Sequence, residues 1–152
     1  MTELISWLEQ LKAFDEANIT DAAPCLEKLI NQPPADMFGP VLTPVHSEAL
    51  AYWFHVCQRL SGMYLHADKP DKAYSYLQFS YSKLQQLACL PQQDPAMKRW
   101  CLIKMDRMIV SMLEFCQHQP LPAWQQESNH LVDLHVRFMQ ANRPITLTSN
   151  PG

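Results

Sequence analysis

Proline bounds most of the segments in this chain that show a helical period of apolar residues. The sequence has 12 prolines and only 3 glycines. Proline is tolerated in the first turn of a helix, where the backbone N–H has no intrahelical partner, but it disrupts helix interiors and central strands. Few glycines leave few positions for the positive φ angles that tight hairpins need. We therefore expect an all-α protein whose helices are joined by stiff connections.

Apolar residues recur at steps of three and four in six segments, which is the spacing of one helix face. Two segments open on a helix-capping residue followed by proline, at Thr43-Pro44 and at Asp94-Pro95. The fold class that we expect is all-α, with about six helices in stacked antiparallel hairpins or an irregular bundle. The predicted helices span residues 3–16, 21–32, 44–66, 70–89, 95–117 and 122–141.

The connection 33–43 is rich in proline but too apolar for a plain linker. We expect an ordered loop that covers the core through Met37, Phe38, Val41 and Leu42. The last ten residues, 143–152, lack a period and are expected to be a flexible tail. The prediction is a single helical domain over residues 1–142.

Charge and hydropathy narrow the class of protein. The net charge of −3 disfavours binding to nucleic acid or acidic membranes by bulk electrostatics. No run of 18 apolar residues and no secretory signal is present, so we expect a cytoplasmic protein without a membrane segment. We interpret the odd number of cysteines as reduced, small core residues: Cys25, Cys57, Cys89, Cys101 and Cys116.

Residues 50–88 form two amphipathic segments joined by a short polar break, with large and small residues at regular intervals. Tyr64 lies four residues after Leu60, Ala73 follows nine residues later, and Leu77 four residues beyond that. This spacing resembles the tetratricopeptide repeat, a helical hairpin in which a small residue allows the two helices to approach closely. The chain departs from the repeat pattern at Cys57, Ser61, Ser80 and Gln85.

A half-match precedes this hairpin, because Ala22, Leu26, Leu29 and Pro34 have the spacing of a repeat's second helix. Repeats of this kind need about three neighbours for a continuous core, and the chain supplies no convincing third copy. An ordinary helical hairpin with alanine at a close crossing explains the pattern equally well, and both interpretations predict the same local structure.

Aromatic residues are concentrated on the two helices of this hairpin, in greater number than one buried stripe holds. Tyrosine and tryptophan are enriched in contact surfaces. We therefore expect a non-catalytic interaction module or adaptor whose partner is another protein or a second copy of the chain. The open alternative is that the proline-rich loop or the sixth helix covers these rings. The predicted binding residues are Tyr52, Trp53, Tyr74, Tyr76, Phe79 and Tyr81.

A regulator associated with transcription or nucleic acid is the alternative function. It would use the basic residues of segment 95–117, which are Lys98, Arg99, Lys104 and Arg107.

Enzymatic chemistry has weaker support. His130, Asp133 and His135 lack the i, i+4 histidine spacing of a zinc helix, and three glycines cannot form a phosphate-binding loop. A nucleophile such as Cys57 or Cys116 with a histidine has no local signature. We expect no enzyme activity, no metal and no cofactor.

Overall fold

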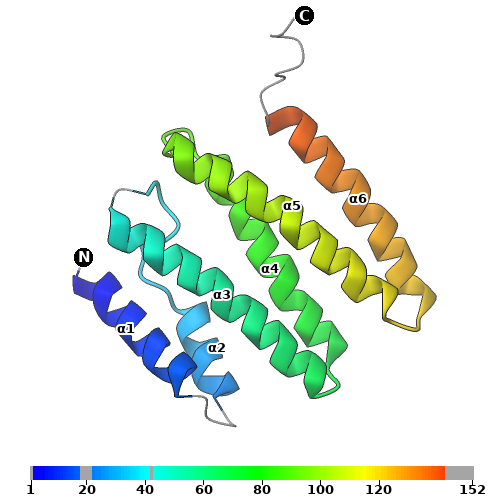
Figure 1. Ribbon diagram of the computed structural model, residues 1–152, viewed down its shortest axis with the longest axis horizontal. Coiled ribbons are helices and arrows are strands. Elements are labelled where there is room, and N and C mark those ends of the chain that lie inside the picture. Colours follow the sequence, from blue (N-terminus) through cyan, green and yellow to red (C-terminus); the bar gives the residue numbers. More distant parts are fainter. Residues whose placement is uncertain (1, 18–21, 42, 143–152) are drawn as a thin grey trace, which may run out of the picture. The chain divides into compact units, whose positions relative to one another are not determined.

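The computed structural model describes residues 2–17, 22–41 and 43–142. The described residues form six α-helices and no strand, which confirms the all-α fold class (Figure 1). Each predicted helix is present, with its ends within two residues of the predicted ones. Leu42 and the predicted tail 143–152 lie outside the described residues. The helices are α1 (Thr2–Glu16), α2 (Ala23–Asn31), α3 (Pro44–His66), α4 (Pro70–Ala88), α5 (Pro95–Gln117) and α6 (Pro122–Asn142).

Both predicted cap-and-proline starts are confirmed. Thr43 has extended backbone angles, and its Oγ1 accepts a hydrogen bond from the backbone N–H of His46 at 3.1 Å. At the start of α5, the Asp94 carboxylate accepts from the Met97 N–H at 3.0 Å. Each side chain satisfies a backbone donor that has no partner within the helix, and the proline that follows needs none.

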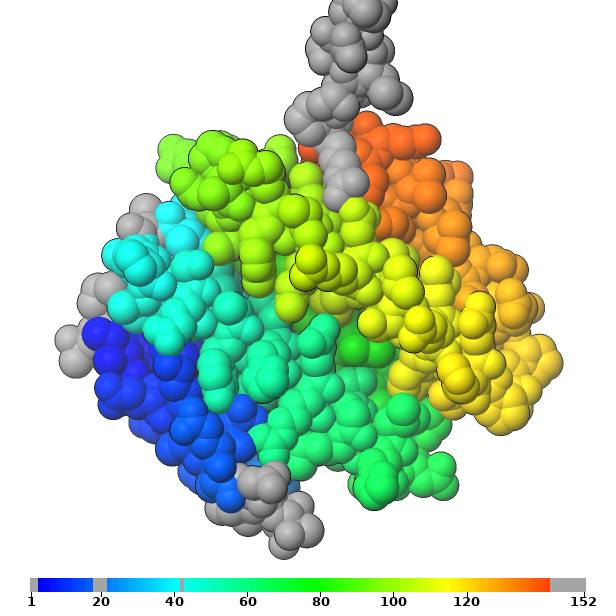
Figure 2. Space-filling model, in the orientation of Figure 1, coloured from blue at the N-terminus to red at the C-terminus, as the bar shows by residue number. Residues whose placement is uncertain are grey.

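The chain divides into two compact units, Met1–Met105 and Asp106–Gly152, with the boundary inside α5. In the first unit α3 is central, because it contacts α1, α2 and α4, and most extensively α4. Side chains of α1 and α3 also meet on the face of the first unit that Figure 2 shows. The prediction of a single domain over residues 1–142 stays a prediction.

The α3–α4 hairpin packs closely at Ala73, as its small side chain predicts. Ala73 and Leu60 are fully buried, and the Ser61 hydroxyl donates a hydrogen bond to the Ala73 carbonyl at 2.7 Å. In the connection, Asp68 adopts a φ of 62°, in the left-handed region that aspartate tolerates better than most residues. This residue turns the chain back, so that only three residues separate the two helices.

Two tryptophans donate hydrogen bonds to carbonyls at the C-terminal end of α2. The carbonyls of Leu29 and Ile30 would normally accept bonds from residues 33 and 34, but both are prolines and have no N–H. The Trp7 indole N–H from α1 donates to the Leu29 carbonyl at 2.9 Å, and the Gln32 backbone N–H donates to the same oxygen at 3.3 Å. The Trp53 indole N–H from α3 donates to the Ile30 carbonyl at 3.1 Å. Helix α2 is therefore fixed between its two neighbours.

The proline-rich connection covers part of the core, as predicted. Met37 is fully buried, and its carbonyl lies 2.6 Å from the imidazole Nε2 of His46. The ring of Phe38 meets that of Trp53 edge-on, with centroids 5.1 Å apart. The backbone N–H of Val41 donates to the Gln93 side chain at 3.0 Å. The side chains of His46, Trp53 and Gln93 therefore connect this loop to the rest of the first unit.

The second unit consists of the remainder of α5 and α6. Within it, His135 Nε2 lies 2.9 Å from the Asp106 carboxylate, and the rings of Phe115 and Trp124 have centroids 5.5 Å apart. Leu131 of α6 is buried. None of the described helices is both long and apolar enough to cross a membrane.

Candidate protein-binding surface

The six aromatic residues predicted to form a contact surface are placed very differently by the structure. Phe79 is exposed, with 36% of its surface accessible, and Tyr52 is half-buried. The other four have less than a tenth of their surface accessible, so they are not available as an exposed contact surface. For the three tyrosines the reason is that α4 buries side chains around more of its circumference than one stripe. The four are Trp53, Tyr74, Tyr76 and Tyr81.

Phe79 is held from one side by the core. Its ring meets the edge of the fully buried Trp53, with centroids 5.4 Å apart. Trp53 also contacts Phe38, so the loop and α4 converge on the same indole. The ammonium group of Lys83, one turn along α4, lies 4.5 Å from the centroid of Phe38 and 5.8 Å from that of Phe79. The exposed ring of Phe79 is therefore positioned by its contacts with Trp53 and Lys83.

A hollow of about 290 Å³ opens beside Phe79, where the end of α2 meets the first turns of α4. Asn31 of α2 forms one side, and four residues of α4 that share a helix face form the other. The four are Lys72, Ser75, Tyr76 and Phe79. We call this hollow, together with Phe38 and Lys83, the α2/α4 surface. It combines aromatic area with an amide, a hydroxyl and two ammonium groups.

The carboxylate of Glu27 fixes the floor of this region. It accepts hydrogen bonds from the hydroxyls of Tyr64 and Tyr76, the latter at 2.6 Å, and pairs with the Lys72 ammonium at 3.3 Å. The two tyrosine rings stack in parallel, with centroids 6.1 Å apart. Burial, and next the hydrogen bond to Glu27, raise the pKa of Tyr76, so its hydroxyl stays a neutral donor. One carboxylate thus links α2, α3 and α4 behind the hollow.

Tyr52 belongs to a different cluster, between α1 and α3. Its hydroxyl donates to the buried Asp15 carboxylate at 2.7 Å, and the Arg59 guanidinium also bonds to that carboxylate. His55 Nε2 lies 3.4 Å from it. Burial alone would raise the pKa of Asp15, but the bonds from Tyr52 and Arg59 and the nearby positive charges outweigh burial and lower it. Tyr52 therefore serves the packing of α1 on α3.

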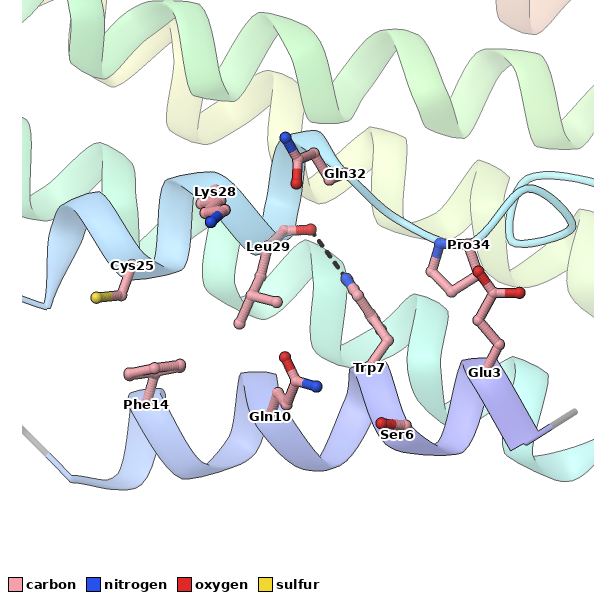
Figure 3. Close-up of a pocket in the computed structure, with 10 residues that line it drawn as sticks. All are labelled: Glu3, Ser6, Trp7, Gln10, Phe14, Cys25, Lys28, Leu29, Gln32 and Pro34. Carbon is pink, nitrogen blue, oxygen red and sulfur yellow. Dashed lines mark hydrogen bonds between the residues drawn. The ribbon is translucent and has the colours of Figure 1, made fainter.

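A larger groove of about 580 Å³ runs between α1 and α2 (Figure 3). Phe14 and Cys25 lie at one end and Glu3 and Pro34 at the other, with the Trp7 bond to α2 between them. None of the predicted binding residues lines this groove.

The basic residues of the alternative function are all on α5. Arg99 and Arg107 are exposed, while Lys98 and Lys104 are half-buried. The Lys104 ammonium lies 5.7 Å from the ring centroid of Trp100. Nucleic-acid binding by these residues stays a prediction.

The cysteines differ from the sequence interpretation in two cases. Cys25 and Cys89 are exposed, so the expectation that all five are core residues is wrong for these two. Cys57, a candidate nucleophile, is buried, and burial raises the pKa of its thiol. A thiol kept protonated is a poor nucleophile. Within the described part of the chain, no three histidine, cysteine, aspartate or glutamate side chains are grouped so that they could hold a metal ion.

Five residues that shape the α2/α4 surface were not predicted from the sequence: Glu27, Asn31, Lys72, Ser75 and Lys83. Lys72 and Lys83 could have been found, because they share the helix face of Tyr76 and Phe79 at steps of three and four. Glu27 and Asn31 come from another helix, and no local pattern relates them to α4.

No known protein family, curated protein or solved structure matches the chain.

Proposed function

We propose that this protein is a non-catalytic interaction module that binds a segment of a partner protein at the α2/α4 surface, and that it acts in the cytoplasm. The observation that carries the proposal is Phe79, a large ring that stays 36% exposed although Trp53 holds it against the core. Rigid aromatic side chains beside a pocket are typical energetic centres of protein interfaces, because they bury apolar area at little cost in side-chain entropy.

The exposed area of Phe79 determines how much its burial can contribute to the free energy of binding. A phenylalanine offers about 200 Å² of surface, of which the exposed third amounts to about 70 Å². Burial of that area at about 25 cal/mol per Å² is worth about 2 kcal/mol, or roughly 20-fold in Kd. The hollow beside it supplies further apolar contact through Tyr76.

The thiols of Cys57 and Cys101, two of the three buried cysteines, are consistent with a non-catalytic role. Burial raises the pKa of Cys57, and it raises that of Cys101 to about 12. Both cysteines are therefore protonated at neutral pH and unsuited to nucleophilic attack. Their side chains fill the core.

The test is selection of binding peptides from a random displayed library on the immobilised protein, followed by fluorescence-polarisation measurement of Kd. We expect Phe79→Ala to weaken selected peptides roughly 20-fold. The control variant is Leu65→Ala, which removes an exposed apolar side chain of α3 that is 45% accessible and outside the surface. If no peptide is selected, or if both variants weaken binding equally, the α2/α4 surface is not the binding site.

A further inference from the structure

We propose that the segment bound at the α2/α4 surface carries an acidic side chain close to a large apolar one. The apolar side chain enters the hollow against Tyr76 and Phe79, and the carboxylate pairs with Lys83. This inference rests on the proposed function and specifies the chemistry of the partner.

Lys83 is the group that selects for acid. Its ammonium lies over the rings of Phe38 and Phe79 and donates one hydrogen bond, to the Gln86 side chain at 3.3 Å. It forms no ion pair with any carboxylate in the described parts of the chain. The two rings hold the cation in place while leaving its charge uncompensated. An incoming carboxylate thus meets a positioned positive charge beside apolar surface, where screening by water is weaker than in bulk.

The lysine at the opposite end of the surface is already neutralised. Lys72 lies 3.3 Å from the Glu27 carboxylate, and its ammonium is 4.4 Å from the ring centroid of Tyr64. Elsewhere in the first unit, Lys12 pairs with Glu48 at 2.6 Å. The available positive charge at the surface is therefore concentrated at Lys83, next to Phe79 and away from Lys72.

The positions of the two features on α4 fix the spacing required in the partner. Lys83 follows Phe79 by one helical turn, which is about 5.4 Å along the axis. An extended peptide advances about 3.3 Å per residue, so an acidic side chain two residues from the apolar one spans this distance. A helical partner covers the same distance with three or four residues. A spacing of two to four residues between the apolar and the acidic side chain is therefore expected.

The library selection described above also tests this inference, through the composition of the peptides whose binding depends on Phe79. We expect aspartate or glutamate two to four residues from leucine, phenylalanine or another large apolar residue. With the tightest such peptide as probe, Lys83→Gln should raise Kd about three- to tenfold, as for a partly exposed ion pair beside aromatic rings. Lys83→Arg should keep most of the affinity, because arginine retains the charge and stacks on rings.

A matched control variant distinguishes an effect of the site from an effect of the protein's overall charge. Lys28→Gln makes the same charge change on the exposed face of α2 and should leave Kd within twofold. Unchanged thermal unfolding of each variant shows that the fold is retained. Raising the salt concentration should weaken the probe on the wild-type protein and have a smaller effect on Lys83→Gln.

The outcomes separate this inference from the proposed function. Phe79-dependent peptides without acidic residues, or equal effects of Lys83→Gln and Lys28→Gln, would overturn the acidic-partner inference and leave the binding function in place. Sedimentation that shows a dimer, lost on Phe79→Ala, would make a second copy the occupant and would also overturn it. Absence of any Phe79-dependent peptide would overturn the proposed function itself.

Discussion

Replacement of Trp53 by phenylalanine should destabilise the first unit strongly, although the position stays aromatic. The indole is fully buried, and its N–H donates to the Ile30 carbonyl at 3.1 Å. Phenylalanine removes about 40 Å³ of volume, which at about 24 cal/mol per Å³ of cavity costs about 1 kcal/mol. The buried carbonyl that loses its donor costs about 1–3 kcal/mol more, since Pro34 cannot replace it. The expected loss is about 2–4 kcal/mol.

Urea unfolding followed by far-UV circular dichroism measures this loss. With an m-value of about 2 kcal/mol per M, the midpoint should fall by about 1–2 M while m stays unchanged. If the two units unfold separately, the shift belongs to the transition of the first unit. Trp100→Phe is the matched control, because Trp100 is half-buried against Phe54 and its indole N–H donates to no described residue. Equal shifts for the two variants would refute the role assigned to the Trp53 bond.

A buried carboxylate, a close helix crossing and the burial of the thiols can each be tested. The lowered pKa of Asp15 stabilises the fold above the unfolded pKa of about 3.9, and this contribution is lost as pH falls through the folded pKa. Acid titration by circular dichroism should therefore show a shallower loss of stability with falling pH in Asp15→Asn than in wild type. Identical slopes of stability against pH would contradict the stabilising role of the Asp15 carboxylate. Ala73→Leu should cost about 1–3 kcal/mol by overpacking the α3–α4 crossing, and an unchanged urea midpoint would show that the helices are not in close contact there. A chromogenic disulfide reagent should label two of the five thiols of the native protein quickly, at Cys25 and Cys89, and mass spectrometry that finds a third fast site would contradict the burial described.

Helix positions were predictable because the signals that set them are local. Thr43 with the proline after it, and Asp94 with the proline after it, fix two helix starts through a cap and an absent N–H, and the bounds of all six helices follow within two residues. The Ala73 crossing was likewise readable from the spacing of small and large side chains. The helix starts depend on neighbours within a few residues, and the Ala73 crossing on residues of one helical hairpin.

The α2/α4 surface was predictable only in part. The structure leaves Phe79 exposed, and its role in binding stays a prediction, whereas Trp53, also predicted as a contact residue, is buried and forms the support beneath Phe79. The supporting role of Trp53 depends on its contacts with Phe38 and Ile30. These residues lie outside α3, and no local sequence pattern relates them to Trp53. Glu27 was missed for the same reason, since its tyrosine donors lie 37 and 49 residues away.

The two prolines after α2 have a consequence for the order of folding. Helix α2 has nine residues, and isolated helices shorter than about 12–15 residues are marginal in water. Its Leu29 and Ile30 carbonyls accept hydrogen bonds from tryptophans 22 and 23 residues away, one on each side in the sequence. We therefore expect α2 to form after α3 and α4 have paired, because that hairpin closes over three residues only. In native-state hydrogen exchange, the amides of α2 should therefore exchange only when α3 opens. Faster exchange, at the rate of a short helix that frays by itself, would contradict the order in which α2 forms after α3 and α4. Completion of α2, the shortest of the described helices, therefore requires both α1 and α3 to be in place.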